Sequence, residues 1–249
     1  ICTDTNTLYG FEALLRWKRP GVGVVAPAAF IREAEESRLI APIGQWVLES
    51  ACRFIRHINE ACSARYLVAV NVSIIQLLRE DYVESVLRTL RETGVEPCLL
   101  ELEITESCLL VETELVIGKL RQLSEAGVHI ALDDFGTGYS SLRYLKDLPV
   151  HVLKIDRYFV DSIVSEKSRS LVNAIVSIGH ALGMALVAEG VENNVQRAVV
   201  GELKCDRLQG YMISRPIPEE SVLSYIRTCE GKDDCAEFAE GGEVSNAEA

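Results

Sequence analysis

The stretch that decides the fold is VHIALDDFGTG, residues 128–138, in which an apolar run ends in two adjacent acids and a Gly-x-Gly turn. The run Val128–Leu132 predicts a buried strand that delivers Asp133 and Asp134 to its carboxyl end. Burial strips both carboxylates of their hydration, which is costly unless a cation offsets their charge. The pattern therefore indicates a divalent-metal site, although a solvated turn has a similar composition because Asp and Gly are common turn residues.

Short apolar runs and longer helical segments alternate along most of the chain. Gly94, Gly127 and Gly183 follow three of the helical segments, where left-handed C-caps are expected. This repeated strand–helix–strand order predicts an α/β fold with a parallel sheet, closed into a barrel by seven visible strands. The strands are expected at residues 8–15, 66–72, 99–104, 128–132, 151–155, 185–188 and 206–208, and the helices at 28–36, 44–58, 81–93, 112–126, 168–182 and 191–203.

The bulk composition narrows the classes of function. The 249 residues are 48% hydrophobic, with a mean hydropathy of +0.14, enough for the core of one large domain. A formal charge of −12 argues against a broad grip on duplex nucleic acid. No apolar stretch reaches the roughly 18 residues of a membrane span, and no secretory signal is visible. The eight cysteines show no CxxC pair, so a cytoplasmic protein with reduced cysteines is expected.

The two ends of the chain differ from its middle. The chain begins at Ile1 in mid-pattern, which suggests a piece of a longer protein. From Thr228 onward acidic residues lie among Gly, Ala and Ser, with little apolar content. We therefore expect one domain over residues 1–227 and a disordered acidic tail over residues 228–249.

Polar and charged residues recur within or at the ends of the expected strands. Their separations of 59, 32, 30, 21, 35 and 20 residues are close to one strand–helix unit or two. In a β/α barrel such positions converge on the carboxyl-terminal rim, where active sites are built. The residues are Glu12, Asn71, Glu103, Asp133 with Asp134, Lys154 with Asp156, Glu189 and Gln209.

These residue types suit a hard cation. Carboxylates and an Asn carbonyl are oxygen ligands for Mg²⁺ or Mn²⁺, and the four histidines share no ligand spacing for zinc. So many acids at one rim suggest two ions bridged by an Asp, an arrangement that activates water for phosphoryl displacement. Lys154 would position that water or neutralise a phosphate oxygen.

Seven motifs carry a family resemblance. EALLRW (12–17), NVS (71–73), EITE (103–106), DDFGTGYSSL (133–142), KID (154–156), EGVE (189–192) and QGY (209–211) stand in the order of the EAL-domain phosphodiesterases of bacterial cyclic di-GMP signalling. The chain resembles this family from about residue 8 to 227. The resemblance implies a modified TIM (β/α)8 barrel that hydrolyses cyclic di-GMP to linear pGpG with Mg²⁺ or Mn²⁺.

The resemblance also implies residue roles. Glu12, Asn71, Glu103 and Asp133 would hold one ion, and Asp133, Asp134 and Glu189 would serve the second. Glu189 would be the general base, with Lys154 and Asp156 orienting the nucleophilic water. Arg16 would meet a substrate phosphate and Gln209 would complete the surroundings of the water and metals. Glu106 would hold the loop after Asp134, which couples dimer contacts to metal binding, and Glu192 is also expected to stabilise a loop.

Departures from the family pattern are few. Ile104 replaces a more usual Leu, His151 stands where Asp is common, and Met212-Ile213 follows QGY. The family's first strand lies upstream of Ile1, so it is expected to be missing or cut short, with consequences for barrel closure. The resemblance further implies a homodimer and upstream sensory or GGDEF-type cyclase domains, with no membrane contact by this segment.

Alternatives remain at the level of the sequence. Each polar residue alone could be a helix cap, a solvated acid or a surface lysine. The chain could also be a receptor that binds cyclic di-GMP, or a partner protein, without hydrolysis. An unrelated metal-dependent barrel acting on a carbonyl substrate is a third hypothesis, less suited to an Asp pair with Arg16. Trp46 is expected in the core, whereas Trp17, Tyr139 and Tyr211 suit either core packing or guanine stacking.

Overall fold

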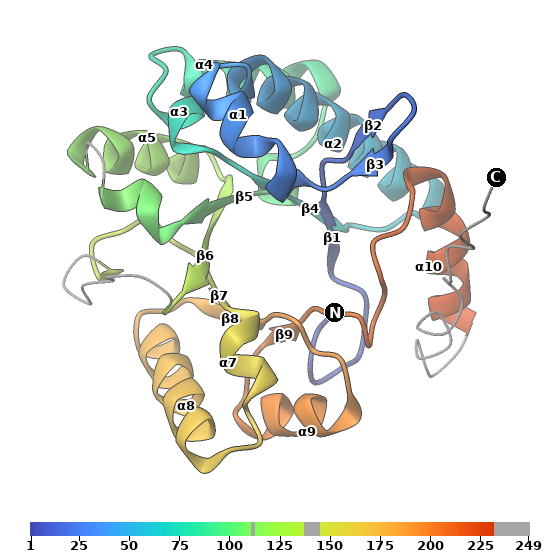
Figure 1. The fold of residues 1–249 in the computed structure, drawn as a ribbon, viewed down its shortest axis with the longest axis vertical. Helices are drawn as coiled ribbons and strands as arrows, with labels where there is room; N and C mark the ends of the chain where they lie inside the picture. The colour runs from blue at the N-terminus through green and yellow to red at the C-terminus, as the bar shows by residue number, and fades with distance from the viewer. Residues whose placement is uncertain (111–112, 137–144, 232–249) are drawn as a thin grey trace. The chain divides into compact units, whose positions relative to one another are not determined.

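A computed structural model describes residues 1–110, 113–136 and 145–231 (Figure 1). The chain divides into two compact units, which are described separately. Unit 1 comprises Ile1–Leu8, Ile155–Ile178 and Leu186–Ala249, and unit 2 comprises Tyr9–Lys154 and Gly179–Ala185.

Unit 2 contains a parallel sheet of four successive strands. They are β1 (Gly10–Ala13), β4 (Leu67–Asn71), β5 (Leu100–Thr105) and β6 (His129–Phe135), each hydrogen-bonded to the next. The next strand is β7 (Val152–Ile155). His151, the residue before β7, is held by two backbone hydrogen bonds. Its N–H donates to the Ile130 carbonyl, and its carbonyl accepts from the Ala185 N–H. The sheet thus places the carboxyl ends of consecutive strands along one edge.

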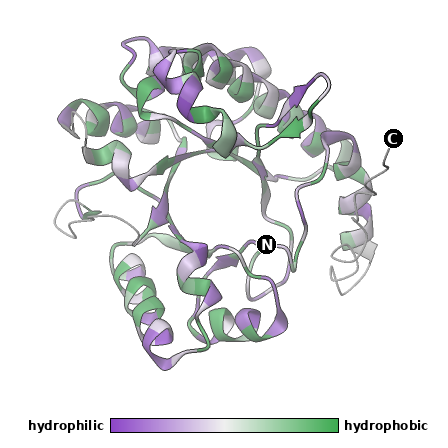
Figure 2. Ribbon diagram, viewed as in Figure 1, coloured by the Kyte–Doolittle hydropathy of each residue, from purple (hydrophilic) through white to green (hydrophobic). Residues whose placement is uncertain are grey.

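Helices cover one face of this sheet, as Figure 1 shows for α2, α4 and α5. Val68 and Val70 of β4 are at most 2% exposed, and α2 packs on β4 and on α4. Figure 2 shows apolar and polar residues mixed along α2 and α4, the pattern of a helix with one buried side. The helices of this unit are α1 (Ile31–Glu36), α2 (Ile40–Cys62), α3 (Ile74–Leu77), α4 (Tyr82–Thr93) and α5 (Thr113–Glu125).

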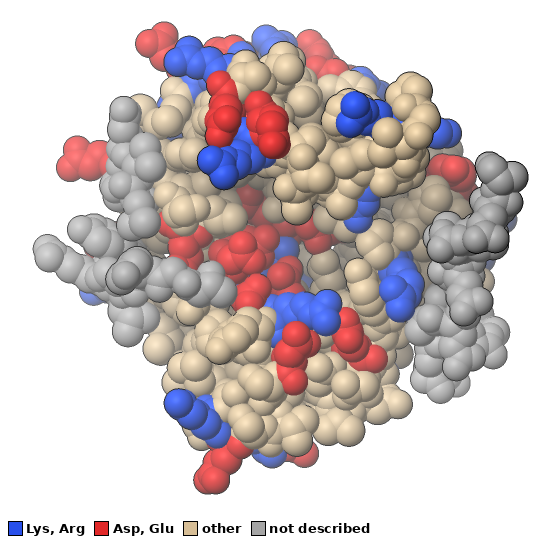
Figure 3. All heavy atoms as spheres, in the orientation of Figure 1, with Lys and Arg blue, Asp and Glu red and all other residues tan. Residues whose placement is uncertain are grey.

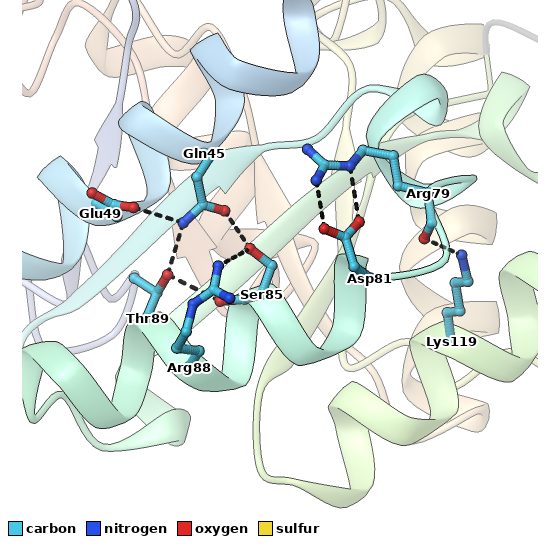
Figure 4. Close-up of polar contacts among 8 residues, drawn as sticks. All are labelled: Gln45, Glu49, Arg79, Asp81, Ser85, Arg88, Thr89 and Lys119. Atoms are coloured by element: carbon cyan, nitrogen blue, oxygen red, sulfur yellow. Dashed lines mark hydrogen bonds and ion pairs between the residues drawn. The ribbon is translucent and has the colours of Figure 1, made fainter.

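Polar contacts lock the helical layer of unit 2 together (Figure 4). The Gln45 amide of α2 donates to Glu49 Oε1 at 2.8 Å and to Thr89 Oγ1 at 3.0 Å. Its carbonyl oxygen accepts from the hydroxyl of Ser85 on α4 at 2.6 Å. Lys119 of α5 is buried and donates to two backbone carbonyls that follow or end α3, those of Leu77 and Arg79. Buried polar groups are thereby satisfied, which fixes the helices relative to one another.

Unit 1 contains most of β8 (Ala185–Ala188), paired in parallel with β9 (Arg207–Leu208). Cys2, near the start of the chain, forms an antiparallel bridge with Arg207 on β9. The helices are α7 (Arg157–Asp161), most of α8 (Glu166–Ala181), α9 (Asn194–Glu202) and α10 (Val222–Gly231). No helix in the described parts of the chain is long and apolar enough to cross a membrane.

All seven expected strands are present, with ends shifted by up to three residues, and Gly94, Gly127 and Gly183 have positive φ as expected. β6 continues through the two acids to Phe135, so these are strand residues. In the described parts of the chain, two strands and three α-helices were not expected: the hairpin of β2 (Trp17–Arg19) with β3 (Gly23–Val25), and the helices α3, α7 and α10. The first two helices are only four and five residues long and begin at side-chain caps, a signal that hydrophobic periodicity does not detect.

Two expectations need correction. Trp46 was expected in the core but is 57% exposed, because it lies on the side of α2 away from its buried residues. The acidic tail was expected to begin at Thr228, but α10 continues to Gly231. The remaining tail residues, 232–249, and residues 137–144, which include the end of the DDFGTGYSSL motif and Tyr139, lie outside the described residues.

Candidate active site

The strand register of unit 2 gathers polar side chains on the face of the sheet opposite the helices. Asn71 pairs in register with Glu103, and Thr105 pairs with Asp133. Because side chains alternate between faces, Glu101, Glu103 and Thr105 of β5 share one face while Leu102 points to the other. Figure 3 shows acidic side chains gathered near β5 and β6 in this view. The sheet thus builds an acidic cluster at its carboxyl edge.

Glu12 and Asn71 lie together on the first two strands of this edge. The Asn71 amide nitrogen donates to Glu12 Oε1 at 2.8 Å, although the residues are 59 positions apart in the chain. The pair offers carboxylate and amide oxygens, the donor types that Mg²⁺ and Mn²⁺ prefer.

Glu103 is the most deeply buried acid of the cluster, at 2% exposure. Its Oε1 lies 2.7 Å from the Lys154 ammonium, which also lies 3.5 Å from Asp133 Oδ1. Burial raises the pKa of Glu103 well above its ordinary value; Lys154 opposes this shift, and the charges of Glu12 and Asp133 add to it. Among the described residues, Glu103 Oε2 has no hydrogen-bond partner. A bound cation would supply that partner and hold Glu103 ionised.

Asp133 and Asp134 occupy a strained end of β6. The Asp134 N–H donates to Asp133 Oδ1 at 2.9 Å, and Asp134 has a φ of +54°, unusual for a residue other than Gly. The next turn is fixed by buried Glu106, whose Oε1 accepts from the Gly136 N–H at 2.8 Å. Glu106 thus holds the start of the loop after the two acids, at Gly136.

Unit 1 carries four other polar residues that the sequence singled out. Glu189 follows β8, and its N–H donates to the Ile155 carbonyl at 3.1 Å. Gln209 follows β9, and its N–H donates to the Ala188 carbonyl at 2.9 Å. Asp156 caps α7, where its Oδ1 accepts from the Tyr158 N–H at 2.8 Å. Glu192 carries an ion pair with Arg157 at 2.9 Å.

The remaining predicted residue, Arg16, lies in unit 2 after β1. Its side chain is exposed, and Nη1 donates to the Leu15 carbonyl at 2.8 Å. An exposed guanidinium three residues past the end of the strand that carries Glu12 suits contact with an anion.

A family model for the EAL domain matches residues 1–216. The chain belongs to the EAL domain family. The bifunctional diguanylate cyclase/cyclic di-GMP phosphodiesterase MucR of Pseudomonas aeruginosa is 42% identical over 91% of this chain and 33% of its own length. Cyclic di-GMP phosphodiesterase PdeR of Escherichia coli is 38% identical over 83% of this chain and 31% of its own length. This EAL domain thus spans about a third of the length of each of these two relatives.

Solved structures agree with the family assignment. The phosphodiesterase of PaMucR, solved as a cyclic di-GMP complex, has a TM-score of 0.85 at 41% identity, covering 89% of this EAL domain and 90% of that chain. The EAL enzyme Bd1971, in a form with cAMP and cyclic di-GMP bound, has a TM-score of 0.87 at 32% identity, covering 91% and 62%. The fold is therefore the α/β, modified TIM barrel of this family.

Two residues near the site were not singled out by the sequence. Glu101 is 5% exposed on the polar face of β5. The alternation of polar and apolar residues in LELEIT predicts on which face of the strand Glu101 lies, but it does not predict that this face is buried. Arg157 directly follows the KID motif and contacts Glu192. Its position next to a motif is a weak signal, because a surface arginine at the start of a helix has the same local sequence.

Proposed function

We propose that this EAL domain is a phosphodiesterase that hydrolyses cyclic di-GMP to linear pGpG with Mg²⁺ or Mn²⁺. The observation that carries the proposal is Glu103, a buried acid with an orphaned oxygen beside Lys154 and Asp133. A buried carboxylate oxygen without a hydrogen-bond partner is costly, and a bound metal ion would supply that partner. The family's other acids are also present, and relatives that match over this segment carry the phosphodiesterase name.

We propose the metal-binding residues that the family resemblance implies. Glu12, Asn71, Glu103 and Asp133 would hold one ion, and Asp133, Asp134 and Glu189 would serve a second. Bound ions of this kind lower the pKa of water and stabilise the charge that develops on a phosphate. The donor set is entirely oxygen, which favours Mg²⁺ or Mn²⁺ over zinc.

The protein residues then divide the work of the reaction. Glu189 would accept a proton from the attacking water while the water oxygen bonds to phosphorus. The P–O bond on the opposite side of the phosphorus would break, and the leaving ribose oxygen would take up a proton. Lys154 and Asp156 would orient this water, and Gln209 would complete its surroundings. Arg16 would bind a phosphate oxygen through its guanidinium. Hydrolysis of one of the two phosphodiester bonds opens the ring to pGpG.

Chromatography of cyclic di-GMP incubated with the chain tests this function. We expect pGpG with Mg²⁺ or Mn²⁺ and none with excess chelator. The variant Glu189→Gln should lose turnover and keep its fold, whereas Glu202→Gln, on the exposed surface of α9, should match the wild type. Tight binding without turnover would show that the chain is a cyclic di-GMP receptor and not an enzyme. If the chain showed neither binding nor turnover, both functions would be refuted.

The setting of the domain is also proposed. We infer a homodimer in the cytoplasm, with upstream sensory or GGDEF-type domains in the full-length protein. The bifunctional name of MucR and the matched third of its length support the upstream domains. No disulfide joins any two of the seven described cysteines.

A further inference from the structure

Arg157, the first residue of α7, ties together two segments of unit 1. Its Nη2 lies 2.9 Å from Glu192 Oε1, and its Nε donates to Asp161 Oδ2 at 3.1 Å. The carboxylates of these two partners raise the pKa of Arg157, with the Asp161 bond as the larger cause. One guanidinium therefore joins α7 to the segment that follows β8.

The stem of Arg157 also covers the backbone beside Glu189. Gly190 has a φ of +69°, and a Cβ placed there would lie 2.5 Å from Arg157 Cγ and 2.8 Å from Arg157 Cβ. Such distances leave no room for a side chain. The methylene groups of Arg157 thus rest directly on the peptide that follows Glu189, where only Gly fits.

Val191, the residue after Gly190, is held by the backbone that follows β9. The Val191 N–H donates to the Gln209 carbonyl at 3.0 Å, and a Cβ on Gly210 would lie 2.2 Å from the Val191 carbonyl oxygen. Glu189 itself is held at its N–H by the Ile155 carbonyl. The EGVE turn is therefore clamped between the backbone of QGY and the side chain of Arg157.

We propose that Arg157 is a positioning residue for Glu189. Its fork orients Glu192, its stem limits the conformation of Gly190, and both fix the direction in which Glu189 leaves β8. The consequence for catalysis rests on the proposed function. Because the Arg157 and Glu192 side chains are 52% and 36% exposed, their ion pair contributes little to stability. The contribution of Arg157 is therefore to geometry.

The variants separate the stem from the fork. Arg157→Ala removes both, whereas Arg157→Lys keeps the methylene stem and the charge without the two-pronged geometry. Arg169→Ala is the matched control, because Arg169 forms another exposed ion pair in unit 1, with Glu202. Each variant is measured for kcat and KM on cyclic di-GMP, for thermal stability, and for amide exchange of the peptide spanning residues 188–192.

For Arg157→Ala we expect amide exchange at residues 188–192 to accelerate about tenfold. We expect kcat to fall about 10- to 100-fold through misplacement of Glu189, with KM little changed. Arg157→Lys should recover most of both losses, and Arg169→Ala should change neither.

Unchanged exchange in Arg157→Ala would overturn the positioning role whether or not the protein is an enzyme. Faster exchange with an unaltered kcat in an active wild type would overturn the link to Glu189. If the wild type shows no turnover, faster exchange in Arg157→Ala alone still supports the clamp, and the phosphodiesterase proposal fails separately.

Discussion

Lys154 and Glu103 form an ion pair in the interior of unit 2, with Nζ 2.7 Å from Oε1 and side-chain exposures of 3% and 2%. They come from β7 and β5, and the ammonium also reaches Asp133 on β6. A charge pair this deeply buried is seldom retained for stability, because desolvation offsets much of the attraction. Its position at the acidic cluster supports the roles in metal binding and catalysis that we propose for these residues.

Breaking this pair should destabilise the protein. In Lys154→Met the Glu103 carboxylate loses its cation inside the protein, and the free energy of unfolding should fall by about 3–5 kcal/mol. Urea denaturation at pH 7 in the presence of chelator measures the change. Lys167→Met, at an exposed position of α8, should stay within about 0.5 kcal/mol of the wild type. Equal stabilities for the two variants would show that the pair is energetically neutral.

Manganese should stabilise the folded protein through the acidic cluster. At a free Mn²⁺ concentration of about 100 Kd, the gain in unfolding free energy should be about 2.7 kcal/mol. Asp133→Asn should lose most of this gain, because it removes a carboxylate charge from the cluster. Asp147→Asn, at an exposed position outside the cluster, should retain it. The comparison is made by denaturation with and without Mn²⁺, and a gain preserved in Asp133→Asn would contradict the proposed ligand set.

Glu106 should control metal affinity without touching the ion. Its Oε1 accepts from the Gly136 N–H and holds the turn that follows Asp134. Glu106→Ala leaves that N–H without its acceptor, and we expect Mn²⁺ affinity to weaken about tenfold, as for other supporting contacts around metals. Calorimetric titration measures it. Glu106→Gln should retain most of the affinity because its amide oxygen can still accept, so a loss equal to that of Ala would point to the charge instead.

We expect acidic pH to lower the stability of unit 2 through protonation of His151. Its Nδ1 accepts from the Ile130 N–H at 3.1 Å, its Nε2 lies 3.2 Å from Ser124 Oγ, and its ring stacks on that of His129. Burial lowers the pKa of His151 below its ordinary value, so the unfolded chain binds the proton more readily. The stabilising contribution is therefore present above the unfolded pKa of about 6.5 and is lost as the pH falls below it.

Denaturation experiments between pH 8 and pH 5 measure the direction of this change in stability. His151→Asn places an amide oxygen where Nδ1 accepts, so its stability should decline less on acidification than that of the wild type. His57→Gln, at an exposed position of α2, should reproduce the wild-type pH dependence. Parallel curves for His151→Asn and the wild type would assign the acid sensitivity to other groups.

Local pattern predicted much of the scaffold. β8 was expected at its observed bounds, because a short apolar run between glycines has few alternatives. The β2–β3 hairpin escaped prediction, since its Trp17, Val22 and Val24 are exposed and do not alternate with a buried face. Asp156 was expected to orient water, and it also caps α7, a role visible only once that helix is placed.

The sequence by itself determined the family and predicted which residues carry the proposed chemistry, because seven motifs with strand–helix spacing stand in the order of the EAL family. The tertiary structure decided their electrostatic states and supports. Strand register buries Glu103 beside Lys154, and chain packing lays Arg157 over Gly190. Both contacts join segments more than 30 residues apart, and neither burial nor distance across such a gap is encoded in local composition. These depend on the register of neighbouring strands, which packing sets over the whole unit.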